Sequence, residues 1–153
     1  MATEVILSEF MPYRLVNLAK KVSDSCSLIY RERFGLSVAE WRVLARLAEH
    51  RSLRAKDLGE ITFMDKSRVS RALKQLEQNG YIDRLANEED NRASDVALTA
   101  AGRALYRQIA PEALAWEKTF LSALDVAEYR ELISVLNNLE DQLEVMNERA
   151  ARG

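Results

Sequence analysis

Cysteine, histidine and proline are scarce in this sequence. The chain of 153 residues has one cysteine, Cys26, one histidine, His50, and two prolines. A lone cysteine excludes a disulfide within the chain, and with only one histidine the sequence has no zinc-binding set in any familiar spacing. So little cysteine is typical of a protein in a reducing compartment. We therefore expect no structural metal and a cytoplasmic protein.

Signals for membranes, secretion and catalysis are also missing. No apolar run approaches the roughly 20 residues of a membrane span, and the N-terminus shows no basic leader followed by an apolar stretch. The sequence has no glycine-rich phosphate loop, no Gly-x-Ser-x-Gly turn and no histidine-based acid/base pair. These absences predict that the protein has no membrane partner, no cofactor and no enzyme activity.

Glycine is scarce too, with five residues, whereas apolar residues recur every three or four positions over long stretches. This periodicity predicts a mainly α protein with about six helices and one β-hairpin. The expected helices cover about 12–34, a segment opened by the capping box 37–40, about 55–61, 65–78, 100–121 and a segment from 125 onward. The expected strands are 81–85 and 95–98. Pro111 predicts a kink or a break in the fifth helix.

The order of these elements indicates a winged helix-turn-helix. A short helix precedes the helix 65–78 at turn distance, and a strand, a polar loop and a second strand follow it. The last helix has an apolar stripe that the rest of the chain is too short to cover, which indicates a second subunit. We expect a single domain over 1–153, with a winged part at 37–99 and obligate dimerisation through 1–36 and 100–153.

The helix 65–78 carries the candidate chemistry. On a helical wheel one side is apolar, and the other is polar and basic, with no acidic residue between Lys66 and Lys74. Arginine and lysine neutralise phosphates or donate to guanine, and glutamine pairs with adenine, so this side fits a major groove. The alternative is an ordinary amphipathic helix with a solvated basic face. The candidate DNA-binding residues are Lys66, Ser67, Arg68, Ser70, Arg71, Lys74 and Gln75.

The polar loop between the two strands holds a second candidate. Asp90 lies two residues before Arg92, and its carboxylate can hold that guanidinium extended toward a narrow minor groove. A solvated turn is the alternative, because these residue types are common at hairpin tips. The position after a helix-turn-helix favours a wing, with Arg92 binding DNA and Asp90 orienting it.

Several segments together resemble one family, the multiple antibiotic resistance regulators (MarR). They are Phe34-Gly-Leu-Ser37, Glu40-Trp-Arg-Val-Leu44, the stretch Asp65–Gly80, Asp90-x-Arg92 and Leu98-Thr-x-x-Gly102. The resemblance covers nearly the whole chain. It implies a homodimer, interlocked by its first and last two helices, that holds two winged modules over a pseudo-palindromic operator.

The resemblance also implies roles for individual residues. The family's groove-reading positions fall on Ser67, Arg68, Ser70, Arg71 and Lys74, and its minor-groove arginine falls on Arg92. The wing departs from the family pattern, because Glu88 and Glu89 precede the motif and residues 94, 95 and 97 are not basic. Binding is therefore expected to depend mainly on the helix 65–78.

Relatives often release DNA when a small aromatic or carboxylate effector binds. Arg14 and Trp41 are the candidate ligand-binding residues, although Trp41 also fits a core position and Arg14 a solvated one. Some relatives sense peroxides through a cysteine. Cys26 lies in mid-helix on the apolar face, which favours a buried, inert thiol.

The function expected from these observations is sequence-specific binding of double-stranded DNA by a transcription regulator, a repressor released by a small molecule. The alternative is a winged-helix adaptor that binds other proteins and not DNA. The acidic wing and the formal net charge of -2 favour the adaptor. The four basic residues Lys66, Arg68, Arg71 and Lys74, with no acidic residue among them, favour DNA.

Overall fold

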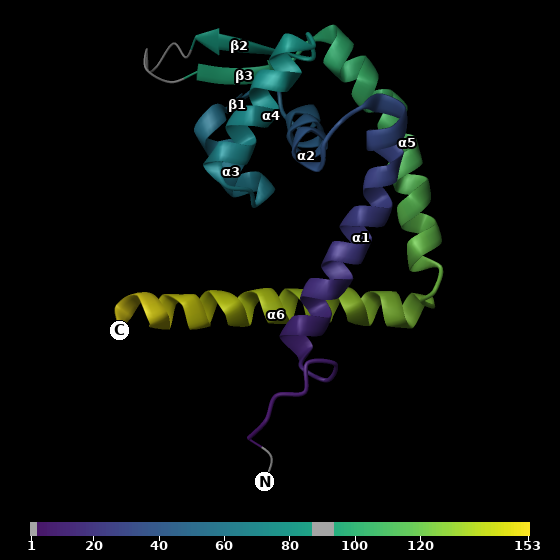
Figure 1. Ribbon diagram of the computed structural model, residues 1–153, viewed down its shortest axis with the longest axis vertical. Helices are drawn as coiled ribbons and strands as arrows, with labels where there is room; N and C mark the ends of the chain where they lie inside the picture. The colour runs from purple at the N-terminus through teal and green to yellow at the C-terminus, as the bar shows by residue number, and fades with distance from the viewer. Residues whose placement is uncertain (1–2, 87–93) are drawn as a thin grey trace. The chain divides into compact units, whose positions relative to one another are not determined.

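The computed structural model describes residues 3–86 and 94–153 (Figure 1). Within them the chain forms six helices and three short strands. The elements in order are α1 (Met11–Phe34), α2 (Val38–Ala48), β1 (Leu53–Arg54), α3 (Ala55–Thr62), α4 (Lys66–Gln78), β2 (Ile82–Ala86), β3 (Ser94–Leu98), α5 (Ala100–Leu121) and α6 (Val126–Arg152). The mainly α winged-helix prediction is confirmed.

The chain divides into two compact units, Met1–Ala113 and Leu114–Gly153. The boundary falls inside α5 and coincides with none of the limits expected from the sequence. The division of function into a winged part at 37–99 and dimerisation parts at 1–36 and 100–153 stays a prediction.

Local sequence signals account for where the helices of the first unit begin and end. Gly35 has φ 66° and ends α1, because a left-handed residue costs glycine little. Ser37 and Glu40 form the expected capping box of α2, in which the Glu40 N–H donates to Ser37 Oγ over 3.1 Å and the Ser37 N–H donates to Glu40 Oε1 over 3.3 Å. Asp65 caps α4, its carboxylate accepting from the Arg68 N–H over 2.8 Å.

The sheet has three antiparallel strands in the order β1-β3-β2. Strands β2 and β3 pair from Ile82 opposite Leu98 to Ala86 opposite Ser94, which gives the expected hairpin. The third strand, β1, was missed, since two residues are too few to show an alternating pattern. Leu53 lies opposite Val96, so β1 covers the edge of β3 just before α3 begins.

One core holds the first unit together. Helix α2 packs against α3, α4 and β3, and α4 also packs against β2 (Figure 1). Half-buried side chains pack around the edge of this core, among them those of Trp41, Tyr81, Leu98 and Tyr106. Its largest fully buried apolar side chains are those of Val43, Leu44, Leu47, Leu58, Leu76, Ile82, Val96 and Ile109.

The start of α5 is joined tightly to the end of α4. Thr99 Oγ1 donates to the Gly80 carbonyl over 2.6 Å and accepts from the Gly102 N–H over 3.0 Å, so one hydroxyl caps α5 and holds the turn after α4. Gly102 is buried against Tyr81, and a Cβ at Gly102 would lie 2.0 Å from the Tyr81 carbonyl oxygen. Pro111 lies at an exposed position inside α5 and does not end the helix, so the expected break is not found.

The second unit comprises the end of α5 and the whole of α6. Trp116 and Phe120 stack with ring centroids 5.2 Å apart. Asp125 and Glu128 form a second capping box, with both hydrogen bonds at 2.8 Å. None of the 27 residues of α6 is buried, although many are apolar. Across the described residues, no helix is both long and apolar enough to cross a membrane.

The close approach at Gly102 can be tested by substitution. Gly102→Ala is expected to lower the free energy of unfolding by at least about 2 kcal/mol, because the new methyl group meets backbone that cannot move aside. This loss exceeds the roughly 1 kcal/mol that alanine gains over glycine in a helix. Urea unfolding measures it, with the exposed neighbour Ala101→Ser as control, expected within about 0.5 kcal/mol of wild type. Equal stability of Gly102→Ala and wild type would contradict the packing.

Candidate nucleic-acid interface

Helix α4 has one buried face and one exposed face. Val69, Ala72, Leu73 and Leu76 are buried in the core. The side chains proposed from the sequence all lie on the exposed face, and these are Lys66, Ser67, Arg68, Ser70, Arg71, Lys74 and Gln75. The exposed face of this 13-residue helix therefore carries seven polar or basic side chains, while its opposite face packs into the core.

The connection between α3 and α4 is a tight turn. Phe63 ends α3 in the left-handed conformation, with φ 55°, and the Met64 N–H donates to the Gly59 carbonyl over 3.1 Å. Thr62 is buried and its hydroxyl donates to the Leu58 carbonyl. Two helices joined this closely, with the second exposing a basic face, have the form of a helix-turn-helix.

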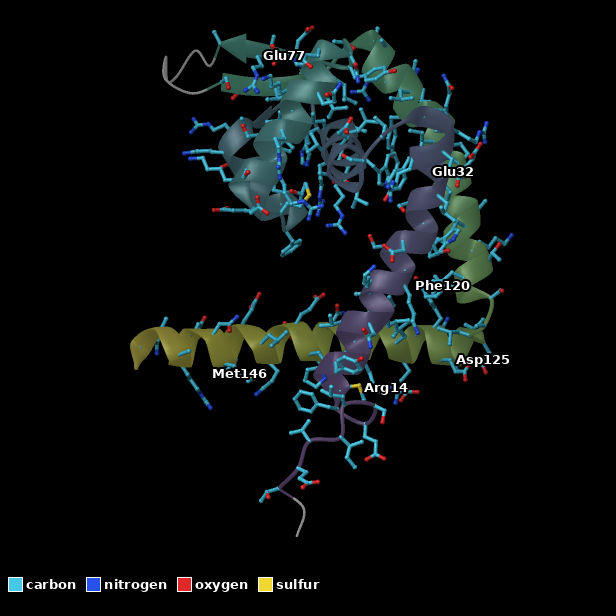
Figure 2. All side chains as sticks on the ribbon, viewed as in Figure 1. Arg14, Glu32, Glu77, Phe120, Asp125 and Met146 are labelled. Carbon is cyan, nitrogen blue, oxygen red and sulfur yellow. The ribbon has the colours of Figure 1, made fainter. Side chains whose placement is uncertain are left out.

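A cleft of about 390 Å³ opens between α3, α4 and β2. Lys56, Lys66, Ser70 and Arg84 contribute its polar lining. Arg84 Nε donates to Glu77 Oε2 over 2.6 Å, and Figure 2 labels Glu77 beside the strands. Neither Lys56 nor Arg84 was expected from the sequence. The position of Lys56 in the first turn of α3 could have predicted its place in the cleft. Arg84 could not be predicted from the sequence, because the packing of β2 against α4 brings it there.

A second cleft, of about 270 Å³, lies between the start of α2 and α4. Arg68, Arg71 and Gln75 line it from α4, and Ser37 and Glu40 line it from α2. A carboxylate therefore shares a cleft with two of the candidate DNA-binding guanidiniums, although the sequence separates it from them by 28 and 31 positions.

The wing candidates Asp90 and Arg92 lie outside the described residues. The strands on either side are in place, with Ala86 paired opposite Ser94. The roles of Asp90 and Arg92 stay predictions from the sequence.

The two candidate ligand-binding residues line different clefts. Arg14, labelled in Figure 2, lines a cleft on α1 with Tyr13, Leu18 and Lys21. Trp41 lines a cleft of about 370 Å³ with residues of α2 and the end of α3. The structure of this single chain therefore does not bring the two side chains into one site.

Trp41 is held in an aromatic stack. Its ring centroid lies 5.5 Å from that of Tyr30 and 6.0 Å from that of Tyr106, and its plane is inclined by 20° and 15° to those two rings. Burial raises the pKa of Tyr30, and the nearby Cys26 thiol adds to this effect, while Arg42 and Arg31 oppose it. Cys26 itself is half-buried at the edge of the core.

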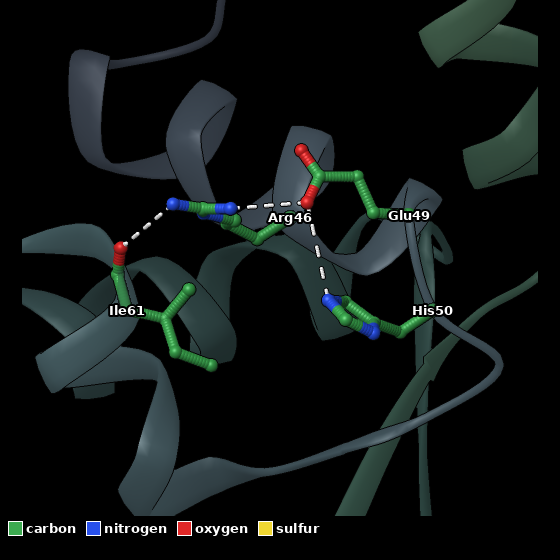
Figure 3. Close-up of polar contacts among 4 residues, drawn as sticks. All are labelled: Arg46, Glu49, His50 and Ile61. Carbon is green, nitrogen blue, oxygen red and sulfur yellow. Dashed lines mark hydrogen bonds and ion pairs between the residues drawn. The ribbon is translucent and has the colours of Figure 1, made fainter.

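Polar contacts fix one wall of the Trp41 cleft (Figure 3). Arg46 donates to Glu49 Oε2 over 3.0 Å and to the Ile61 carbonyl over 3.3 Å, which joins α2 to the end of α3. His50 Nε2 lies 3.9 Å from the same Glu49 oxygen. Arg42, on the same cleft, has no hydrogen bond or ion pair with another described residue.

A two-helix turn, an exposed basic second helix and a three-stranded sheet define a winged helix-turn-helix protein. Residues 34–93 match the model of the MarR family. A MarR family transcriptional regulator from Silicibacter pomeroyi DSS-3, solved as a crystal structure, is 31% identical, with 92% of this chain and 99% of that chain covered and a TM-score of 0.79. The chain belongs to the MarR family of transcription regulators, as the resemblance implied.

Two further relatives agree. A MarR/EmrR family transcriptional regulator from Acinetobacter sp. ADP1 has a TM-score of 0.82 at 28% identity, covering 92% of this chain and 99% of that one. The HTH-type transcriptional regulator SarZ of Staphylococcus aureus is 30% identical over 112 residues, or 73% of this chain and 72% of SarZ.

Two more distant structures share the fold. MepR of S. aureus was solved as a complex with DNA, and it has a TM-score of 0.79 at 20% identity, covering 88% of this chain and 98% of that one. NadR was solved with 4-hydroxyphenylacetate, with a TM-score of 0.72 at 22% identity and coverage of 94% and 95%.

The raised pKa of Tyr30 makes a prediction about stability at alkaline pH. Above about pH 10 the unfolded chain loses the Tyr30 proton before the folded chain does, so the tyrosine's contribution to stability falls as pH rises through the folded pKa. Tyr30→Phe keeps the ring and removes this loss. Urea unfolding of both proteins between pH 8 and 11 is expected to show the free energy of unfolding of wild type falling relative to that of Tyr30→Phe as pH rises. The control is Tyr13→Phe, on the exposed part of α1, and a pH-independent difference for Tyr30→Phe would count against the assignment.

Proposed function

We propose that this chain binds double-stranded DNA as a homodimer, with α4 of each subunit in a major groove, and thereby regulates transcription. The observation that carries the proposal is the two-sided character of α4. Its apolar face is buried, while its exposed face offers Lys66, Arg68, Arg71 and Lys74 with no acidic residue among them. A net charge of -2 gives little general attraction to DNA, so this local cluster supplies it.

The chemistry of this face matches both parts of DNA recognition. Lysines and serines suit phosphate contacts, which fix the position of the protein, whereas arginine and glutamine can read guanine and adenine edges. The strands on either side of residues 87–93 support this arrangement, because β2 and β3 pair up to Ala86 and Ser94, the described residues nearest to Arg92 in the sequence. We propose that Arg92 enters the minor groove and that Asp90 orients it.

The exposed apolar face of α6 supports a homodimer. Its large side chains recur every three or four positions along the helix, and a helix in water does not keep such a stripe uncovered. A second copy of the chain offers the same stripe, so a two-fold contact covers both. The stripe comprises Val126, Tyr129, Ile133, Leu136, Leu139, Leu143 and Met146, of which Figure 2 labels Met146.

A two-fold dimer predicts the form of the DNA site. Two copies of α4 meet two half-sites about one helical turn apart, so the operator is pseudo-palindromic. The MepR complex supports this class of function, because a protein of the same fold was solved with DNA. We also propose that the protein works in the cytoplasm, because a DNA-binding regulator acts where the chromosome is. All the relatives described above are regulators, which favours this function over an enzyme.

We further propose that a small aromatic carboxylate releases the DNA and that the protein is a repressor. The cleft at Trp41 combines an aromatic residue with the guanidinium of Arg42, which has no hydrogen bond or ion pair within the described part of the chain, and this combination suits such a ligand. NadR, which shares the fold, was solved with 4-hydroxyphenylacetate. The other candidate, Arg14, would join this ligand only from another copy of the chain, since it lines a different cleft.

Binding to DNA is tested with duplexes selected by the wild-type protein from a randomised library and with the region flanking its gene. Wild type is expected to prefer a selected duplex over a shuffled one. Arg71→Ala is expected to cost about 1–3 kcal/mol and to relax this preference, whereas Lys74→Ala is expected to weaken binding to both duplexes and, by removing one phosphate contact, to reduce the salt slope by about 0.9. Arg92→Ala tests the wing in the same assay.

The control is Lys118→Ala, which removes one exposed charge from α5 and leaves the helix-turn-helix unchanged. It is expected to bind both duplexes as wild type does. If wild type shows no preference and neither Arg71→Ala nor Arg92→Ala changes binding at low salt, the DNA-binding proposal fails. The winged-helix adaptor that binds other proteins then becomes the better explanation.

Release is tested by titrating 4-hydroxyphenylacetate into the protein–DNA complex. Half-release in wild type is expected at a concentration that Arg42→Gln raises about tenfold, since the amide cannot replace a charge-assisted bond to the carboxylate. Arg31→Gln removes a charge from the neighbouring helix and serves as control. The cleft assignment fails if Arg42→Gln and wild type release DNA at the same concentration.

A further inference from the structure

Glu40 is an exception among the buried polar side chains. Within the described residues three polar or charged side chains are buried, those of Ser27, Glu40 and Thr62. The Ser27 and Thr62 hydroxyls both donate to backbone carbonyls. Glu40 is 8% exposed, and only its Oε1 has a partner, the Ser37 N–H. Its Oε2 is buried without a hydrogen bond. A buried acceptor without a donor lowers the stability of the folded state, so its presence needs an explanation, and a function is one.

The cleft at Glu40 contains the donors that this oxygen lacks. Arg68 and Arg71 line it from α4, together with Gln75, and guanidinium groups bind carboxylates through two parallel hydrogen bonds. Neither guanidinium has a hydrogen bond or ion pair with another described residue. Glu40, whose Oε2 is buried without a hydrogen bond, and two arginines with no such partner among the described residues thus line one space of about 270 Å³.

The surroundings of the two arginines favour Arg71 as the partner. Arg68 lies three residues after Asp65, whose carboxylate caps the same turn of α4. Arg71 has no acidic neighbour on its own helix, because the positions three and four residues away hold Ser67, Arg68, Lys74 and Gln75. Glu40 is therefore the carboxylate that this cleft offers to Arg71.

We propose that Glu40 is a positioning residue for DNA recognition. When α4 enters the groove, Arg71 donates from one edge of its guanidinium to Glu40 Oε2 and from the other edge to a base. Arginine has five donors in a rigid fork, so both contacts can form at once. The carboxylate limits the directions that Arg71 can take, and this makes Arg71 selective for a base instead of for any nearby phosphate. The inference rests on the proposed DNA-binding function.

The capping box allows a clean substitution. A glutamine at the third helical position still caps α2 when its amide oxygen accepts from the Ser37 N–H. Its NH2 group then takes the place of Oε2, and an NH2 group cannot accept a hydrogen bond from a guanidinium. Glu40→Gln therefore keeps the helix start and removes the second contact. Glu128 has the same place in the capping box of α6, is exposed and lines none of these clefts, so Glu128→Gln is the matched control.

The experiment measures affinity for a selected duplex and for a shuffled duplex of the same composition, using the full-length chain. Glu40→Gln is expected to reduce the ratio of the two affinities about tenfold, which is the order of discrimination that one bidentate pair with a base provides. Its affinity for the shuffled duplex and its thermal midpoint are expected to match those of Glu128→Gln and wild type. Repeating the selection with Glu40→Gln is expected to relax one base position in each half-site.

A double-mutant cycle identifies the partner. In an Arg71→Ala background Glu40→Gln is expected to change the ratio no further, while in an Arg68→Ala background the tenfold loss remains. The inference is overturned if Glu40→Gln keeps the wild-type ratio, or if its effect persists without Arg71. A wild-type protein with no preference for any duplex would overturn the proposed function and this inference together, which distinguishes the two failures.

Discussion

The burial of one face of α4 is the constraint on which the structure depends. Leu76 and Val69 of this helix are buried in the core. Helices α2 and α3 and strand β2 pack against α4, and α1, β1 and β3 pack against these neighbours. Burial of the apolar face stabilises the fold, so α4 cannot rotate about its axis to bring its basic face into the core. The orientation of the basic face, and with it the proposed function, is thus fixed by the side chains that never meet DNA.

Backbone contacts around Thr99 and Gly102 transmit this constraint to α5. The Thr99 hydroxyl joins the turn at Gly80 to the start of α5, and Gly102 lets the helix approach the Tyr81 carbonyl. The two residues belong to the Leu98-Thr-x-x-Gly102 segment that resembled the family. Their physical role is now clear, because a hydroxyl and a missing side chain are what this junction requires.

Much of the fold could be predicted because its signals are local. Helix periodicity, the capping boxes at Ser37 and Asp125, and the left-handed Gly35 depend on residues within a turn of one another. The missed strand β1 shows the limit of local signals. Two residues are too few to show the alternation of apolar and polar side chains that indicates a strand. Leu53 and Arg54 form a strand only because Leu53 pairs with Val96, 43 positions later.

The candidate site divides in the same way. The sequence by itself determined the exposed face of α4, because helical geometry separates Arg71 and Lys74 from Val69 and Leu73 without reference to any other element. Only the tertiary structure decided that Lys56 and Arg84 lie beside that face, that Arg14 and Trp41 line different clefts, and that Glu40 shares a cleft with Arg71. Such contacts join residues far apart in the chain, and helix packing sets them, so no local pattern encodes them.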